Sequence, residues 1–337
     1  MTLRIGTRGS ALALAQSGQV ATRLGDAQLV PIASEGDRSQ AAGTPLAQLG
    51  GTGVFVTNLR TALLAGEVDA IVHSLKDLPT APAEGLEIAA IPKRADARDA
   101  VIGRDGLKLA GLPAGARVGT GSPRRRAQLA SVRPDIEVVD IRGNIDTRLG
   151  RVAGTAVAAA ADGAGAETGS DRRLDAIVLA VAGLERLDRL HPVSELLSIS
   201  DWPTAPGQGA LAVEVRAGEG HKVAKLDHRP SRLAVEAERT VLAVLEAGCA
   251  APVGAHAILE DGLLFLSARV YSLDGTQHLT ASHAAYPEDE KDPAAVLGRL
   301  VAEDLLRQGA ADLAPLGASG ALHGDGAADS ADGGSAS

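Results

Sequence analysis

Arginine is concentrated in one part of this chain and at one kind of position. The 337 residues carry a formal net charge of −9, yet residues 117–151 contain eight arginines and only four acidic residues. Two of these arginines, Arg124 and Arg125, follow Ser122 at an expected helix start directly after a strand. The N–H groups at a helix N-terminus attract anions, and arginine adds planar donors suited to carboxylate or phosphate. The segment therefore predicts a site for a ligand with several negative groups.

The same placement occurs twice more. Arg142 follows an expected strand and opens an expected helix, with Arg148 about one turn further on, and Arg8 stands just before an expected helix start at Ser10. Arginines at several strand-to-helix junctions would line the carboxyl edge of α/β sheets, where ligands bind. A solvated basic face explains one such arginine well and three of them poorly. Phosphate stays an alternative ligand, although the chain has no Gly-x4-Gly-Lys-Ser/Thr loop.

A lysine and an aspartate end an expected buried strand. Lys76 and Asp77 lie side by side, two residues beyond the end of that strand, and precede a proline turn. An exposed pair of this kind contributes little to stability. Alternatively, Lys76 binds an anionic ligand while Asp77 stabilises a developing positive charge. The two residues alone leave both interpretations open.

The rest of the composition excludes several classes of protein. Cys249 is the single cysteine, so the chain forms no internal disulfide and no cysteine-rich metal site, and we expect no metal. Nothing argues for an oxidising compartment, a signal peptide or a membrane span, so we expect a cytoplasmic protein. The net negative charge and the scarcity of aromatic residues argue against a nucleic-acid partner.

Strands alternate with helices over the first 215 residues, which predicts α/β sheets. The expected strands are residues 3–7, 29–33, 70–73, 86–91, 100–102, 116–120, 136–140, 176–180 and 210–215. The expected helices are residues 10–24, 54–65, 145–152 and 181–190, with another beginning at Ser122.

The pattern restarts at residues 116–120, which predicts two similar lobes split near residues 94–99. We expect residues 1–95 and 204–228 to form lobe 1 and residues 96–203 to form lobe 2, so that two crossings make a hinge and a cleft. Residues 229–317 predict a C-terminal α+β domain with helices at 231–247 and 293–308 and antiparallel strands at 255–259, 263–271 and 278–284. Residues 153–170 and 318–337 have the composition of a surface insertion and a disordered tail.

Seven segments, in chain order, resemble the porphobilinogen deaminase family. His73-Ser74-Leu75-Lys76-Asp77-Leu78-Pro79 is similar to the family's HS-(M/L)-KD-(V/L)-P signature. The other similar segments are residues 4–10, 119–125, 142–149, 180–184, 206–210 and 246–249. The resemblance covers residues 3–315. One tripeptide would mean little, but this many ordered matches are highly specific.

The resemblance implies a transferase of tetrapyrrole (porphyrin and haem) biosynthesis, also called hydroxymethylbilane synthase. Such an enzyme joins four porphobilinogen molecules head to tail, releasing ammonia each time, to give linear hydroxymethylbilane, which uroporphyrinogen-III synthase uses. The oligopyrrole chain would grow on a dipyrromethane cofactor held by a thioether to Cys249. The family fold has two lobes similar to type II periplasmic binding proteins and a third domain that carries the cysteine, and the family suggests a monomer.

The resemblance also assigns site residues, because each pyrrole brings an acetate and a propionate. Residues aligned with the cofactor site are Lys76, Asp77, Thr120, Ser122, Arg124 and Arg125. Residues aligned with the substrate carboxylates, or expected to hydrogen-bond beside them, are Arg8, Ser10, Gln16, Arg142, Arg148 and Arg186. Asp77 would be the catalytic carboxylate, with Lys76 beside it, stabilising positive charge at the pyrrole nitrogens and assisting proton transfer. Thr52 and Thr57 depart from the lysines that the family often has in its glycine-rich loop.

A binding protein without turnover is the main alternative. A two-lobed receptor for a polycarboxylate or oxyanion would explain the placement of the arginines and the hinge. It would need neither Cys249 nor a third domain.

Overall fold

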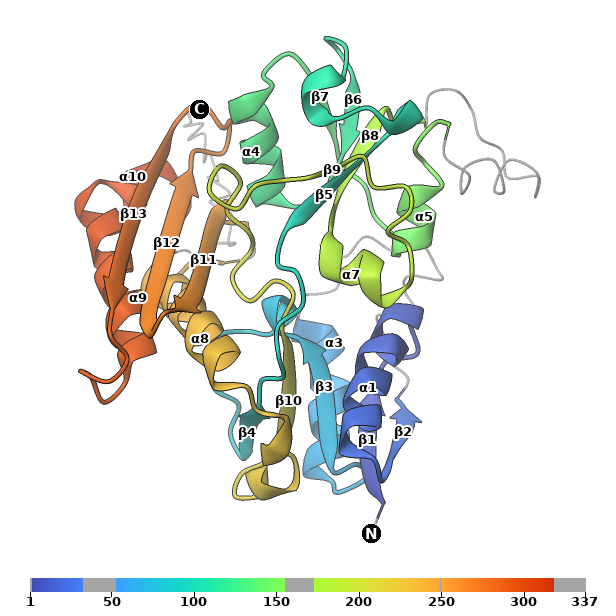
Figure 1. Cartoon of the computed structure of the whole chain (residues 1–337), viewed down its shortest axis with the longest axis vertical. Helices are drawn as coiled ribbons and strands as arrows, with labels where there is room; N and C mark the ends of the chain where they lie inside the picture. Colours follow the sequence, from blue (N-terminus) through green and yellow to red (C-terminus); the bar gives the residue numbers. More distant parts are fainter. Residues whose placement is uncertain (1, 33–52, 155–172, 249, 318–337) are drawn as a thin grey trace, which may run out of the picture.

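Three sheets organise the part of the chain that the structure describes (Figure 1). The computed structural model describes residues 2–32, 53–154, 173–248 and 250–317. Two of the sheets have five strands and mixed directions, and the third has three antiparallel strands. This confirms the expected fold class of two α/β units followed by an α+β unit. The expected insertion, the expected tail and most of the glycine-rich loop before residue 53 lie outside the described residues.

Lobe 1 is built on the sheet with the strand order β2-β1-β3-β10-β4. Its strands are β1 (Leu3–Thr7), β2 (Ala27–Pro31), β3 (Ala70–Ser74), β4 (Leu86–Ala90) and β10 (Leu211–Arg216). The first three run parallel to one another, and β10 pairs antiparallel with both β3 and β4. Its helices are α1 (Ala11–Leu24) and α3 (Gly53–Leu64). Ile5, Val72 and Val213 bring three of the strands into one buried core.

Lobe 2 repeats this arrangement with the order β7-β6-β8-β5-β9. Its strands are β5 (Asp99–Gly103), β6 (Arg117–Gly119), β7 (Glu137–Val139), β8 (Ala176–Ala180) and β9 (Glu195–Leu196). Its helices are α4 (Pro123–Val132), α5 (Ile145–Leu149) and α7 (Val181–Arg186). Here β6, β7 and β8 are parallel, and β5 pairs antiparallel with β8 and β9. In each lobe three parallel strands are thus followed by one antiparallel strand.

The antiparallel strand of each lobe adjoins a crossing to the other lobe. Residues 91–98 lead from β4 into β5, and residues 197–210 lead from β9 back to β10. The crossings touch where Ala95 donates its N–H to the carbonyl of Gly209 over 3.3 Å. Gly209 has a φ of +86°, and a Cβ there would lie 2.8 Å from the Ala95 oxygen, so the crossings approach this closely only with glycine. The two connections form the expected hinge.

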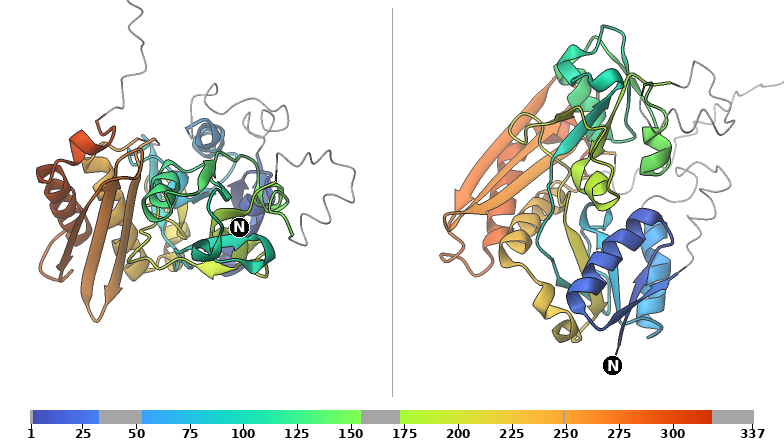
Figure 2. Two further views of the ribbon diagram at one scale, coloured as in Figure 1. Left: turned by 90° about the horizontal axis from the view of Figure 1, so that it is seen from above. Right: turned by 45° about the vertical axis from the view of Figure 1, so that its right-hand side comes forward.

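The C-terminal domain packs two long helices against its three-stranded sheet. Its elements are α8 (Arg229–Val244), β11 (Val253–Glu260), β12 (Leu263–Tyr271), β13 (His278–Ala285), α9 (Pro293–Arg307) and α10 (Ala310–Leu313). Seen from above, the sheet stands with its helices on one side (Figure 2). Side chains of β12 alternate between this core and solvent, as a half-buried strand requires. Buried residues of α8, α9 and all three strands form one core.

Some expected bounds were wrong, for local reasons. α5 ends at Leu149, before Gly150, and not at residue 152. α7 ends at Arg186 and not at residue 190, because Asp188 adopts a left-handed conformation (φ +56°) that stops the helix. The short strand β9 and the 3-10 turn η2 (Leu75–Asp77) were not expected. The residue limits of the three units stay predictions.

Candidate active site

Lys76 and Asp77 lie in η2, the turn at the carboxyl end of β3. Leu75, which begins the turn, is fully buried and donates its N–H to the carbonyl of Ala210 over 3.0 Å. Arg239 of α8 donates to the carbonyl of Leu78 over 2.8 Å, so the C-terminal domain braces the other end of the turn. The side chains of Lys76 and Asp77 are exposed. Two exposed charges are therefore presented from a fixed backbone.

A group of cations surrounds this turn. The Lys76 ammonium reaches the side-chain oxygen of Gln208 in the hinge at 3.5 Å. Although part of the Lys76 side chain reaches solvent, the surrounding protein desolvates its ammonium group and lowers its pKa. The charge of Asp77 opposes this shift, and the nearby charges of Arg125 and Arg124 add to it. A bound anion would offset the repulsion between these positive charges. The electrostatics at the turn therefore favour an anionic ligand.

Asp99 is the buried counterion of lobe 2. Arg124 donates to its carboxylate over 2.8 Å, and Arg125 donates twice, over 2.6 and 3.1 Å. Trp202 and Gln208 complete the shell, donating to Asp99 over 2.9 and 2.7 Å. Although burial opposes ionisation, the two guanidinium groups hold the pKa of Asp99 far below its usual range. The carboxylate is ionised and accepts five hydrogen bonds.

The same contacts decide where Arg124 and Arg125 point. Both side chains are buried, and besides Asp99 they donate to the carbonyls of Pro203 and Val178 over 2.9 and 3.0 Å. The sequence predicts direct cofactor contacts for this pair, whereas most of their donors are used within the protein. The Nε of Arg124 is buried and has no hydrogen-bond partner among the described residues.

Thr120 and Ser122 shape the turn that leads into α4. The hydroxyl of Thr120 accepts from the Ser122 N–H over 3.2 Å, and the Ser122 hydroxyl caps the helix by accepting from the Arg125 N–H over 3.4 Å. Ser122 is the helix N-cap, as expected. Both hydroxyls therefore lie at the carboxyl end of β6, beside the buried arginines.

Arg142 and Arg148 belong to the same electrostatic group. Burial lowers the pKa of Arg148, the charges of Arg125 and Arg142 lower it further, and the negative charge of Asp77 raises it. Arg148 donates through Nε to the carbonyl of Gly143 over 2.8 Å, which leaves its terminal nitrogens without a partner in the described part of the chain. Arg142 is largely exposed, with only a 3.2 Å contact to Asp140. These side chains can exchange solvent for a ligand's carboxylates.

Lobe 1 contributes further residues at the carboxyl end of its sheet, where Lys76 lies. The parallel strands β1 and β3 end on one side of the sheet, so Arg8 after β1 and Lys76 after β3 share that side. Ser10 caps α1 by accepting from the Ala13 N–H over 3.3 Å. The buried amide of Gln16 donates to the Ser74 hydroxyl over 2.7 Å. Gln16 therefore fixes α1 to the residue that precedes η2.

Four residues singled out in the sequence lie elsewhere or cannot be placed. Arg186 donates to the carbonyl of Gly209 over 2.8 Å and lines a different cavity, at the hinge. Thr57 is exposed on α3. Cys249 and Thr52 lie outside the described residues.

Sequence reasoning missed Asp99, Gln208 and Trp202. One signal for Asp99 was available. It opens a strand with the sequence Asp-Ala-Val-Ile-Gly, all of it buried, and an acid at such a position requires a cationic partner. Gln208 lies within the matched segment 206–210, but that match assigned it no role. Trp202 gave no comparable signal, because it lies in a crossing segment without regular periodicity.

Two family profiles cover most of the chain. The first, described as "Porphobilinogen deaminase, dipyromethane cofactor binding domain", matches residues 3–224, and the second, "Porphobilinogen deaminase, C-terminal domain", matches residues 232–307. The chain belongs to the porphobilinogen deaminase family. A porphobilinogen deaminase of Leifsonia xyli is 54% identical over 93% of this chain and 94% of its own length. One from Thermobifida fusca is 51% identical over 91% and 94%.

Porphobilinogen deaminase activity in tetrapyrrole biosynthesis is therefore the function of this chain, with porphobilinogen as substrate and a dipyrromethane cofactor-binding domain. The alternative of a binding protein without turnover is set aside. Solved structures with a similar fold include a YaeC-family lipoprotein from Enterococcus faecalis (TM-score 0.33, 13% identity, 66% of this chain and 88% of that one). An arginine-transport periplasmic binding protein from Legionella pneumophila is similar too (TM-score 0.32, 15% identity, 67% and 91%). These scores add nothing to the assignment.

The donors around η2 suit the carboxylates of a dipyrromethane. The set combines a lysine, exposed and half-buried arginines, two hydroxyls and the unpartnered Nε of Arg124. No cluster of His, Cys, Asp or Glu able to hold a metal ion occurs in the ranges that the structure describes. Across those ranges, no helix is both long and apolar enough to cross a bilayer.

Proposed function

We propose that the residues around η2 form the site at which four porphobilinogen units are joined head to tail to give hydroxymethylbilane. One observation carries the proposal. Lys76 and Asp77 are exposed, side by side, at a sheet edge where Arg125 and Arg148 contribute positive charge. Such a site attracts a polycarboxylate and offers one fixed anion within it.

The cations supply binding and orientation. Every porphobilinogen brings an acetate and a propionate, so each added ring adds two negative charges. Arg142 and Arg148 have guanidinium nitrogens available for bidentate contacts with these groups, and Arg8 and Ser10 stand at the facing edge of lobe 1. Arg186 would contribute its positive charge from the hinge, where it donates a hydrogen bond to the carbonyl of Gly209. Holding both reactants in register reduces the entropy cost of joining them.

Asp77 would supply the chemistry. In each addition the aminomethyl carbon of porphobilinogen loses ammonia and bonds to the α-carbon of the chain-end pyrrole, which gives up a proton. Positive charge develops at the pyrrole nitrogens before and after the new bond forms. A carboxylate fixed on the braced η2 turn stabilises that charge without reorganising, and it can accept the proton. Lys76, beside it, holds a carboxylate of the same ligand.

Cys249 is our proposed attachment point for the cofactor, through a thioether. It lies outside the described residues, between Gly248 and Ala250 in the connection from α8 to β11. The dipyrromethane supplies the pyrrole from which the chain grows. Lys76, Thr120, Ser122, Arg124 and Arg125 would hold its carboxylates. The support is the single cysteine at the matched sequence position and the donor set described above.

Three further features belong to this proposal. They are the cytoplasmic location, the monomeric state and the use of the product by uroporphyrinogen-III synthase. Each is supported by the family resemblance in sequence. Size-exclusion chromatography with light scattering, and a coupled assay with that synthase, test the last two.

The Asp77→Asn variant tests the catalytic role. Asp77 is exposed and makes no hydrogen bond or ion pair with another described residue, so we expect unchanged folding by circular dichroism. Product formation should fall by about 100-fold or more, the usual range for a removed charge-stabilising or proton-transfer group. The matched control is Asp135→Asn, an exposed carboxylate paired with Arg133, which should keep wild-type turnover. Near-normal turnover of Asp77→Asn would remove Asp77 from the mechanism.

A further inference from the structure

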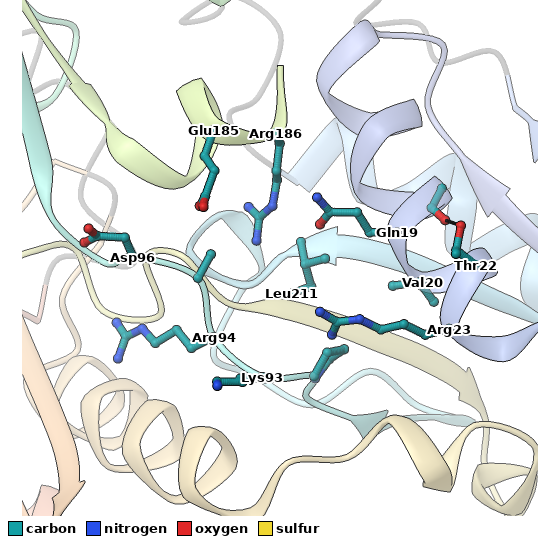
Figure 3. A pocket seen from close by; sticks show the side chains of 13 residues that line it. Gln19, Val20, Thr22, Arg23, Lys93, Arg94, Asp96, Glu185, Arg186 and Leu211 are labelled. Atoms are coloured by element: carbon teal, nitrogen blue, oxygen red, sulfur yellow. Dashed lines mark hydrogen bonds between the residues drawn. The ribbon is translucent and has the colours of Figure 1, made fainter. Parts of the chain in front are cut away.

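A cavity lies at the hinge, and the residues of η2 do not line it. It has a volume of about 820 Å³ and is walled by α1 of lobe 1, α7 of lobe 2, the first crossing and the start of β10. Figure 3 shows its side chains converging from these elements. The helices α1 and α7 lie next to each other across the lobe boundary (Figures 1 and 2). Lys76, Asp77 and Arg148 are not among its lining residues.

The charges on its wall do not balance. Arg94 is paired with Glu238 and Asp96 with Arg98, so these lining groups are neutralised. The lining charges that remain are Arg23, Lys93, Arg186 and Glu185. Three positive charges and one negative charge leave a net charge of +2 on the wall.

These cations have hydrogen-bond donors that are not used within the described residues. Arg23 and Lys93 are exposed and make no hydrogen bond or ion pair within the described ranges. Arg186 uses one terminal nitrogen on the Gly209 carbonyl at 2.8 Å, while its Nε is buried with no partner in those same ranges. Burial lowers the pKa of Arg186, Glu185 raises it, and the like charge of Arg23 lowers it. An anion between Arg23 and Arg186 would satisfy both.

We propose that this hinge cavity is a second anion site, which binds a small di- or tricarboxylate. Its volume falls within the ordinary range for small-molecule sites, and its two excess charges match a ligand with two or more carboxylates. Arg23 comes from lobe 1 and Arg186 from lobe 2. A bound polycarboxylate therefore links the lobes and favours the arrangement that holds α1 beside α7.

Titration calorimetry of the holoenzyme with citrate, at constant ionic strength, tests the site. We expect citrate to bind the wild type at least about tenfold more tightly than acetate does. The double variant Arg23→Ala, Lys93→Ala should raise the Kd for citrate by about tenfold or more. Both side chains are exposed and unpaired in the described ranges, so this variant should keep the fold and the turnover measured without citrate. The matched control is Arg299→Ala, an exposed arginine on α9, which should leave the Kd unchanged.

Arg148→Ala separates the hinge cavity from the active site. Because Arg148 does not line the cavity, the citrate binding that depends on Arg23 and Lys93 should persist in this variant. The proposal is overturned if the double variant binds citrate like the wild type, or if Arg148→Ala abolishes all binding. It is also overturned if acetate binds as tightly as citrate. The outcome does not depend on Asp77, so it stands apart from the catalytic proposal.

Discussion

Replacing Asp99 by asparagine should destabilise lobe 2 while leaving the shape of the side chain almost unchanged. The carboxylate is fully buried and accepts five hydrogen bonds, three of them from Arg124 and Arg125. If the asparagine oxygen takes the Oδ2 position, its NH2 group faces two other donors, Nη2 of Arg125 and Nε2 of Gln208. Those bonds, at 2.6 and 2.7 Å, are then lost.

The size of the effect follows from these two losses. A hydrogen bond to a charged group contributes about 1.5–3 kcal/mol, and one between neutral groups about 1 kcal/mol. Two guanidinium groups also remain buried without their counterion, and breaking a buried ion pair costs about 3–5 kcal/mol. Because these figures describe overlapping effects, we expect the free energy of unfolding of lobe 2 to fall by about 3–5 kcal/mol in total.

Trp202 offers a built-in reporter for this change. It is the single tryptophan of the chain, is buried, and donates to Asp99 over 2.9 Å. Urea unfolding followed by its fluorescence, and in parallel by circular dichroism, should give a clearly lower midpoint for Asp99→Asn. Asp135→Asn, which breaks an exposed pair, should unfold like the wild type. An unchanged midpoint for Asp99→Asn would refute the view that Asp99 is the counterion on which Arg124 and Arg125 depend.

The dependence on pH gives a second readout of the same group. The folded-state pKa of Asp99 is depressed far below the value of about 3.9 for an unfolded chain. Its contribution is therefore present above about pH 4 and is lost as the pH falls towards the folded-state pKa. The wild type should lose stability below pH 4 more steeply than Asp99→Asn, so the difference between the two proteins should shrink there.

Two further substitutions, each with a control substitution, test how the C-terminal domain is attached and packed. Glu238→Gln should lower the unfolding midpoint, because Glu238 is fully buried and pairs with Arg94 of the hinge at 2.6 Å. Its control is Glu236→Gln, at a half-exposed position of α8, which should change the midpoint little. Gly298→Ala should cost about 1–3 kcal/mol in urea unfolding, because a Cβ there would lie 2.5 Å from Thr240. Gly18→Ala in α1, where nothing lies within 4 Å, should be neutral or stabilising, and equal effects of the two alanines would contradict the close packing of α8 and α9.

The sequence predicted the fold class well because its signals were local. Alternating strands and helices, the cap at Ser122 and the restart of the pattern at residues 116–120 each depend on neighbouring residues. Helix ends were less predictable. The left-handed Asp188 ends α7 one turn early, and no apolar pattern encodes that conformation.

Candidate site residues were predicted from motifs, and their partners were not. Nothing in the sequence indicates that Arg124 and Arg125 share Asp99, which lies about 25 residues away in the chain at the start of β5. Similarly, the family resemblance placed Arg186 with the other cations, while the structure places it at the hinge. Contacts between the lobes depend on the crossings at residues 91–98 and 197–210. These segments have no regular hydrophobic periodicity from which such contacts could be predicted.

The intact mass of the purified, active protein is the most direct test of the whole account, because it asks whether the chain carries its own primer. We predict an excess over the sequence mass equal to one two-pyrrole unit, located by peptide mapping on the peptide that contains Cys249. The Cys249→Ala variant should show the unmodified mass and make no hydroxymethylbilane. An unmodified mass in fully active wild-type protein, or the two-pyrrole unit on any other peptide, would contradict the account.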